Sequence, residues 1–144
     1  MIDPERARAV VFEPVTVTLD RGRLAFFAAA TGQQDPVYSD PDAAKAVGHP
    51  DLPVPPTFLF GLETERPGAF DYLDALGVDL RRVLHGEQSF TYHVLVHAGD
   101  TVTLRPRITD AYAKKNLDFL VKRTEITRDG EPVADAVTTI VVRG

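Results

Sequence analysis

Three short segments of this 144-residue sequence combine polar side chains with residues that restrict the backbone, a composition typical of binding and catalytic loops. They are residues 31–41 (TGQQDPVYSDP), 48–57 (GHPDLPVPPT) and 85–88 (HGEQ). A carboxylate or an imidazole in such a segment can accept or donate a proton near neutral pH, which is the basis of general acid–base catalysis. Asp35 in the first segment and His85 in the third are therefore the candidate catalytic residues.

Each segment also has a purely structural interpretation. Residues 31–41 could be the end of one helix, a turn and the start of the next helix. Residues 48–57 contain four prolines and could be a stiff linker, and residues 85–88 could be a solvated turn in which Gly86 relieves strain. Spacing alone does not separate these interpretations from a functional site.

The elements around the first segment follow from periodicity and capping signals. Residues 15–19 alternate apolar and polar side chains, which is typical of a half-buried strand. Residues 21–31 have apolar side chains at helical spacing after Asp20, a good N-cap residue, so we predict a helix there. A second short helix is expected from Pro41, with Ser39 or Asp40 as its N-cap and Gly48 as its stop.

The middle of the chain is less regular. Residues 49–56 must be extended because proline removes a backbone donor and disfavours a helix before it. Residues 57–62 form an apolar run that fits a strand or a short helix. Residues 63–82 mix charged residues, glycine and scattered apolar residues, and we expect a long excursion with about one helical turn.

From Gln88 onward the sequence alternates through four segments separated by turn signals. Asp129-Gly130 is the strongest hairpin signal, and Pro106 places part of the second segment on a sheet edge or at a bulge. The apolar positions are Phe90, Tyr92, Val94 and Val96 in the first segment, Val102, Leu104 and Ile108 in the second, Leu117, Phe119 and Val121 in the third, and residues 133–142 in the fourth.

These elements predict the fold class α+β, in one domain over residues 1–144, with a curved antiparallel sheet of about five strands around a helix. One face of such a sheet has to be covered. We expect the helix over residues 21–31 to cover it with Phe26 and Phe27.

Composition excludes several classes of function. Sixteen Lys and Arg against 21 Asp and Glu give a net charge of −5, so we expect no nucleic-acid partner. No apolar run reaches the ~18 residues that span a membrane, the start of the sequence is unlike a signal peptide, and there is no cysteine, so we expect a cytoplasmic protein without a membrane partner. We expect no cofactor and no metal, because the four histidines, His49, His85, His93 and His97, lack the spacing and carboxylate neighbours of a metal site.

The order of the three segments and their amino-acid sequences resemble those of the MaoC-like dehydratases of the hot-dog fold, a family that includes (R)-specific enoyl-thioester hydratases. Residues 31–41 are similar to the family's hydratase motif, Gly-Asp-x-Asn-Pro-hydrophobic-His-x-Asp-Pro. Pro56-Thr57-Phe58 and residues 84–88 (LHGEQ) are similar to motifs of the N-terminal half-domain in the family's double hot-dog members. The resemblance covers nearly the whole chain and implies a hot-dog fold.

The sequence departs from this pattern at the residues that do the chemistry. The family's catalytic aspartate aligns with Gln33 and its catalytic histidine with Tyr38. A glutamine amide does not titrate, and a tyrosine phenol, whose usual pKa is roughly 10, is a poor base at neutral pH. The usual dyad is therefore absent, as it is in the family's N-terminal half-domains, which hold the acyl chain.

The resemblance implies an (R)-3-hydroxyacyl-thioester dehydratase or enoyl-thioester hydratase of fatty-acid metabolism, or its acyl-binding subunit. The expected partners are an acyl-CoA or acyl-ACP thioester and either a second copy of the chain or a dyad-bearing MaoC-like subunit. Three alternatives remain: a homodimeric enzyme that uses Asp35, His49 or His85, a noncatalytic acyl-thioester binding protein, and a hot-dog thioesterase. Besides Asp35 and His85, the candidate substrate-binding residues are Gln33, Tyr38, His49, Pro56, Thr57, Phe58, Gly86 and Gln88.

Overall fold

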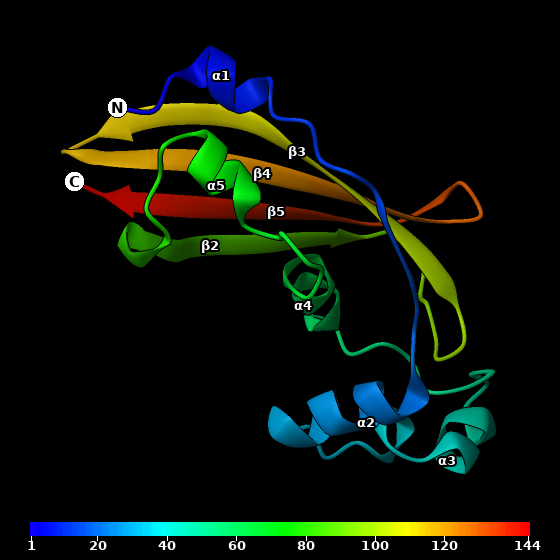
Figure 1. Cartoon of the computed structure of the whole chain (residues 1–144). Helices are drawn as coiled ribbons and strands as arrows, with labels where there is room; N and C mark the ends of the chain where they lie inside the picture. Colours follow the sequence, from blue (N-terminus) through cyan, green and yellow to red (C-terminus); the bar gives the residue numbers. More distant parts are fainter.

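The structure, a computed structural model, describes residues 1–144 and is built on one five-stranded antiparallel sheet (Figure 1). The strands lie in the order β1-β3-β4-β5-β2. Their bounds are Val15–Thr18 for β1, Val83–Tyr92 for β2, Thr101–Lys114 for β3, Leu117–Arg128 for β4 and Glu131–Arg143 for β5. The last three of the four expected segments form consecutive hairpins, but the first does not pair with the second as an antiparallel meander would require: β2 pairs with β5 at one edge, and β1 pairs with β3 at the other.

Tight turns join β3, β4 and β5. Asp129 and Gly130 both have positive φ (51° and 80°), as a two-residue hairpin turn requires, which confirms the prediction from the Asp-Gly pair. Lys115 and Asn116 form the other turn, also with positive φ (49° and 60°). Because lysine rarely adopts this backbone conformation, the sequence carries only a weak signal for that turn.

The helices are short. Their bounds are Pro4–Arg8 for α1, Arg21–Ala30 for α2, Pro41–Ala46 for α3, Phe58–Thr64 for α4 and Asp71–Ala75 for α5, with single 3-10 turns at Pro36–Tyr38 (η1) and Leu80–Arg82 (η2). Asp20 caps α2 and Asp40 caps α3 through their carboxylates, as predicted. The ambiguous apolar run begins α4, and the excursion that follows includes α5 and η2. None of the helices has both the length and the apolar character that crossing a membrane would take.

The prediction that α2 covers the sheet with Phe26 and Phe27 is wrong. The concave face of the sheet carries α4 and α5, whereas α2 and α3 lie well away from it (Figure 1). Only Leu24 and Ala28 of α2 are buried, and Phe26 is 77% exposed because it lies on the opposite side of that helix. α4 makes the better cover since its residues at helical spacing, including Leu59 and Leu62, are buried together.

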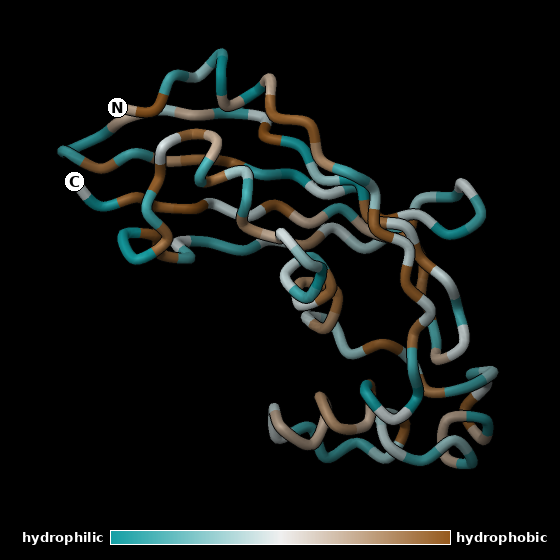
Figure 2. The backbone as a smooth tube through the Cα atoms, viewed as in Figure 1, coloured by the Kyte–Doolittle hydropathy of each residue, from teal (hydrophilic) through white to brown (hydrophobic).

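The strands alternate between the two faces of the sheet, and hydropathy alternates with them (Figure 2). In β5 the inward residues are all buried; they are Ala134, Ala136, Thr138, Ile140 and Val142. β2 ends at Tyr92, so Val94 and Val96, which were predicted to belong to this strand, lie beyond its end. Pro106 lies beyond the end of β1, where β3 has no partner on that side, which confirms its predicted place on a sheet edge.

Candidate functional site

The loop between α2 and α3 is organised by its own side chains. The Gln33 side-chain oxygen accepts a hydrogen bond from the Asp35 N–H at 3.1 Å. The Asp35 carboxylate accepts one from the Val37 N–H, also at 3.1 Å, and so caps η1. Gln33 and Asp35 are exposed and Tyr38 is half-buried. Asp35 therefore lies at the surface, with its carboxylate bonded to its own loop.

The His85-Gly86-Glu87-Gln88 segment is a β-bulge within β2. The register against β5 shifts between His85 and Glu87, so Gly86 is the extra residue. His85 lies opposite Ile140 and Gln88 opposite Thr138, both inward positions of β5. Residues three apart in a regular strand face opposite sides of the sheet, and the bulge is what brings His85 and Gln88 to the same face.

A small polar network forms there. The His85 ring bonds the Gln88 side-chain oxygen at 3.1 Å, and that oxygen also accepts the Thr138 hydroxyl at 2.7 Å. The ring of Phe60, from α4, stacks on His85 at 4.7 Å between centroids. Gly86 is required because a Cβ there would lie 2.7 Å from the Val141 Cγ2 atom. The candidate residues of this segment are thus positioned by the sheet and by α4.

His49 takes part in a contact that sequence reasoning did not find. Its Nδ1 atom lies 3.0 Å from Nε2 of His97, and both rings are half-buried. Burial, and then the neighbouring His49, lower the pKa of His97 below its usual value. The nearby carboxylates have cationic partners already: Arg128 pairs with Asp100, and Arg21 with Asp51, whose pKa is lowered to about 2 by hydrogen bonds from Arg21 and Leu52. The histidine pair ties the segment after α3 to the turn before β3.

The Pro56-Thr57-Phe58 motif forms the entry to α4. The Pro56 carbonyl accepts a hydrogen bond from the hydroxyl of Tyr92. Thr57 is exposed at the N-cap position of α4 and makes no side-chain capping bond. Phe58 is buried and packs edge-to-face against Phe27 of α2, with 5.4 Å between ring centroids.

The structure does not gather all the candidates at one place. The loop with Gln33 and Asp35 is on the α2–α3 side of the molecule, and β2 with His85 and Gln88 is in the sheet (Figure 1). Between them, the Pro56 entry to α4 and the His49–His97 contact connect the two regions. No group of three or more His, Asp or Glu side chains is arranged to hold a metal ion.

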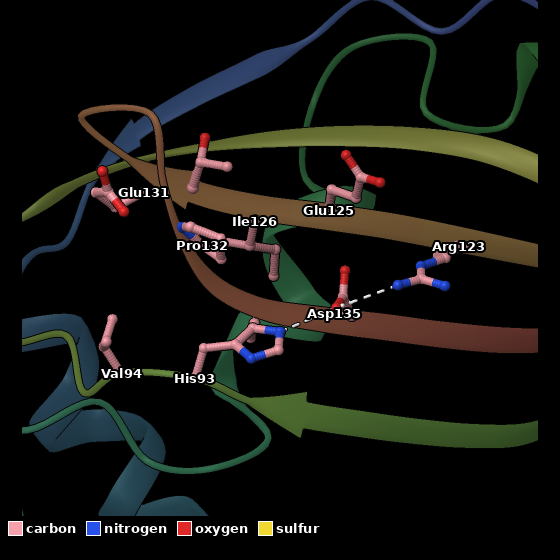
Figure 3. A pocket seen from close by; sticks show the side chains of 10 residues that line it. His93, Val94, Arg123, Glu125, Ile126, Glu131, Pro132 and Asp135 are labelled. Carbon is pink, nitrogen blue, oxygen red and sulfur yellow. Dashed lines mark hydrogen bonds and ion pairs between the residues drawn. The ribbon is translucent and has the colours of Figure 1, made fainter.

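Sequence reasoning also missed a polar cluster beside the sheet. His93 lies 3.0 Å from Asp135, and Arg123 reaches the same carboxylate at 3.2 Å, in a hollow of about 520 Å³ (Figure 3). The hydrogen bond from His93 is the main cause of the lowered pKa of Asp135. His93 and Asp135 are 42 residues apart, and only the pairing of β2 with β5 shows that they meet.

Comparison with known proteins shows which family the chain belongs to. A family model described as "FAS1-like, dehydratase domain region" matches residues 6–136. A UPF0336 protein of Saccharopolyspora erythraea is 41% identical over 125 residues, covering 86% of this chain and 80% of that protein. A UPF0336 protein of Clavibacter michiganensis is 35% identical over 144 residues, covering 99% of this chain and 97% of that protein.

Solved structures share the fold. A chain of the HadBC (3R-hydroxyacyl-ACP dehydratase) complex from Mycobacterium tuberculosis superposes with a TM-score of 0.82 at 27% identity, covering 94% of this chain and 96% of that one. A MaoC-like dehydratase superposes with a TM-score of 0.81 at 22% identity, over 96% of this chain but 43% of the other, so that likeness shows the fold alone. This chain belongs to the FAS1-like dehydratase-region family and has the hot-dog fold of these dehydratases.

Proposed function

We propose that this chain is the acyl-binding subunit of an (R)-3-hydroxyacyl-thioester dehydratase and that a partner chain supplies the catalytic Asp and His. The observation that carries the proposal is the presence of Gln33 and Tyr38 at the two dyad positions of an otherwise full family pattern. Two similar structures are complexes named after two different chains, HadBC and ChsH1-ChsH2, which supports a partner subunit.

The chemistry explains why a partner is needed. Dehydration of a 3-hydroxyacyl thioester requires one group to take the proton next to the carbonyl and another to protonate the leaving hydroxyl. Asp35 already accepts a hydrogen bond within its own loop, and His85 lies in the sheet, bonded to Gln88. These two groups are on different elements and do not form a pair that could remove and donate protons on the same substrate molecule.

The β2 edge of the sheet is where we place the partner. All of β2, ten residues, pairs on one side only, with β5. The other edge is protected: β1 covers residues 101–104, and Pro106, a bulge between Ile108 and Asp110, and the neighbouring α1 interrupt the rest. An open edge of this length is a template for another strand. Partner pairing along β2 would bring the second chain beside His85 and Gln88.

The acyl tail has a candidate place between α2 and α4. A groove of about 470 Å³ lies there, with Phe26, Phe27 and Phe58 among its lining residues and Arg23 paired with Glu65 at its rim. Phe26 gains nothing from packing within the chain because it is 77% exposed. An apolar tail laid against it would be removed from water, which favours binding by about 25 cal/mol for each Å² of apolar surface buried.

The proposal is tested by hydration of crotonyl thioesters, followed by the loss of enoyl-thioester absorbance. The purified chain alone should be inactive, and it should become active when mixed with a short MaoC-like chain that has an intact Gly-Asp-x-Asn-Pro-x-His motif. Asp35→Ala and His85→Ala variants of the lone chain are the controls. Activity of the lone chain that either variant abolishes would refute the proposal and favour the self-sufficient homodimeric enzyme.

A noncatalytic acyl-thioester binding protein is the second candidate. It is favoured by the separation of Asp35 from His85 on different elements. Under this alternative the chain binds acyl thioesters, and no dyad-bearing partner restores hydration. Binding measured by calorimetry beside the activity assay separates the two functions.

A further inference from the structure

Glu87 is the one carboxylate on the open β2 edge. It lies opposite Thr139 of β5, on the convex face of the sheet, and is exposed. No cationic side chain lies within ion-pair distance of it. The position of this carboxylate matters because any strand that pairs with β2 brings its own side chains next to it.

The bulge limits how a second copy could pair with β2. Register with β5 shows which β2 residues face the concave side of the sheet and which the convex side. The concave ones are Val83, His85, Gln88, Phe90 and Tyr92, and the convex ones are Leu84, Glu87, Ser89 and Thr91. Residues opposite each other in an antiparallel pair lie on the same face.

One full-length self-pairing satisfies this condition. It places Gln88 opposite the same residue of the second copy, Glu87 opposite Ser89, and His85 opposite Phe90, with Gly86 left as the unpaired residue on both strands. With Gly86 unpaired, a pairing that set Glu87 against itself would also match the faces, with His85 opposite Gln88, but it would leave Thr91 and Tyr92 unpaired and would place the two Glu87 carboxylates directly opposite each other. The register centred on Gln88 is therefore the one that pairs β2 along its full length.

In that register the two copies of Glu87 are diagonal neighbours. Diagonal positions across an antiparallel pair are roughly 7–8 Å apart, within reach of long side chains. Two carboxylates at this spacing repel each other, and nothing on the convex face of β2 neutralises them. A partner strand with Lys or Arg at the same place would turn the repulsion into attraction.

We infer that Glu87 disfavours pairing of this chain with itself and selects a second hot-dog chain whose edge strand carries a cationic side chain diagonal to Glu87. The inference rests on the proposed function in one respect, that the β2 edge receives the partner. It adds what the partner's strand must carry, and it can be tested with this chain alone.

The test measures self-association by sedimentation for the full chain and for Glu87→Gln. Removing the charge should tighten self-association up to about fivefold, the upper range for one cross-strand pair. The matched control is Glu5→Gln, which removes an exposed carboxylate from α1 beside the protected edge and should change nothing. The gain from Glu87→Gln should shrink at high salt, where exposed charges are screened.

A mixing experiment sharpens the test. Glu87→Lys should not self-associate better than the wild type, because two lysines repel as two glutamates do. An equal mixture of unlabelled wild type and uniformly ¹⁵N-labelled Glu87→Lys, resolved by native mass spectrometry, should contain mostly mixed dimers, favoured by roughly an order of magnitude over each self-pair.

Three outcomes would overturn the inference. The first is equal self-association of wild type and Glu87→Gln, and the second is a statistical ratio of mixed dimers to self-dimers in the mixture of wild type and Glu87→Lys. The third is the absence of any dimer in every sample up to about 100 μM. These outcomes are independent of the proposed function, which fails instead when a dyad-bearing partner restores no hydration. A preference for mixed dimers together with an inactive complex would support the edge selection and refute the enzymatic proposal.

Discussion

The two segments that carry the family's motifs are held in different ways. The side chains of Gln33 and Asp35 bond only within their own loop, which is exposed on the α2–α3 side of the molecule. The His85–Gln88 segment is part of a ten-residue strand, and its side chains contact β5 and α4. The conformation of the loop thus depends on local sequence, and that of the strand segment depends on tertiary packing.

This difference separates two kinds of role. A self-contained exposed loop can meet a substrate or a partner without disturbing the core. A bulge inside a sheet is expensive to alter because its side chains are coupled to neighbouring strands. Substitutions should therefore affect stability strongly around His85–Gln88 and weakly in the loop, and the following predictions test that contrast.

The largest effect is expected at the anchor of α4. Glu63 and Lys122 form a buried ion pair at 3.3 Å, Thr124 donates to the same Glu63 oxygen, and the other carboxylate oxygen has no partner. Glu63→Gln leaves Lys122 charged and buried, which should lower the free energy of unfolding by about 3–5 kcal/mol. Phe60 on the same helix should then lose its fixed stacking on His85.

Denaturant unfolding measures this cost. The double variant Glu63→Leu with Lys122→Met removes both charges and should recover most of the lost stability, since buried ion pairs are often no better than apolar packing. A loss below 1 kcal/mol (roughly the surface-pair range) in Glu63→Gln would show that the pair does not anchor α4.

A smaller effect is expected at the bulge itself. Gly86→Ala places a methyl group 2.7 Å from the Val141 side chain and 3.3 Å from the Thr139 carbonyl oxygen. The overpacking should cost about 1–3 kcal/mol and move His85 relative to Gln88. Ser89→Ala on the convex face of the same strand is the control; unchanged His85 ring resonances by NMR in Gly86→Ala would contradict the prediction.

The contact between His49 and His97, which links the two regions, should make the free energy of unfolding depend on pH. The pKa of His97 is lowered in the folded chain, so between the folded and unfolded values the unfolded chain binds more protons. Stability from this contact is fully present above the unfolded pKa of about 6.5 and is lost as the pH falls through the folded value. His49→Gln should weaken this dependence, because the neighbouring imidazole is one cause of the lowered pKa.

Unfolding free energies at about pH 7.5 and pH 5.5 test this, in a window above the usual carboxylate pKa values. An identical drop in wild type and His49→Gln would show that the contact between His49 and His97 does not carry the effect.

The smallest effect is expected in the loop. Asp35→Ala removes the cap of a three-residue 3-10 turn at the surface and should cost at most about 1 kcal/mol. In a complex with a dyad-bearing partner, this variant should keep its hydration activity within about threefold, which is under 1 kcal/mol. A larger loss of activity with unchanged stability would mean that the loop touches the reacting substrate.

Local signals in the sequence predicted much of the fold. The Asp20 and Asp40 helix caps and the Asp129-Gly130 turn depend on interactions within a few residues, and Pro106 on an edge follows from the missing N–H of proline itself; the structure confirms all of them. Because such signals are local, they could not show that α2 does not cover the sheet. Periodicity shows that Leu24 and Ala28 share a face, but it does not show which surface that face meets.

The candidate site shows the same division. The sequence by itself determined that Gln33 and Tyr38 replace the dyad, because residue type alone decides whether a side chain titrates. Only the tertiary structure decided that a bulge turns His85 and Gln88 to one face, that His49 meets His97, and that Glu87 stands on an open edge. The physical reason is that strand register and helix docking are set by contacts between residues far apart in the chain, which no local pattern encodes.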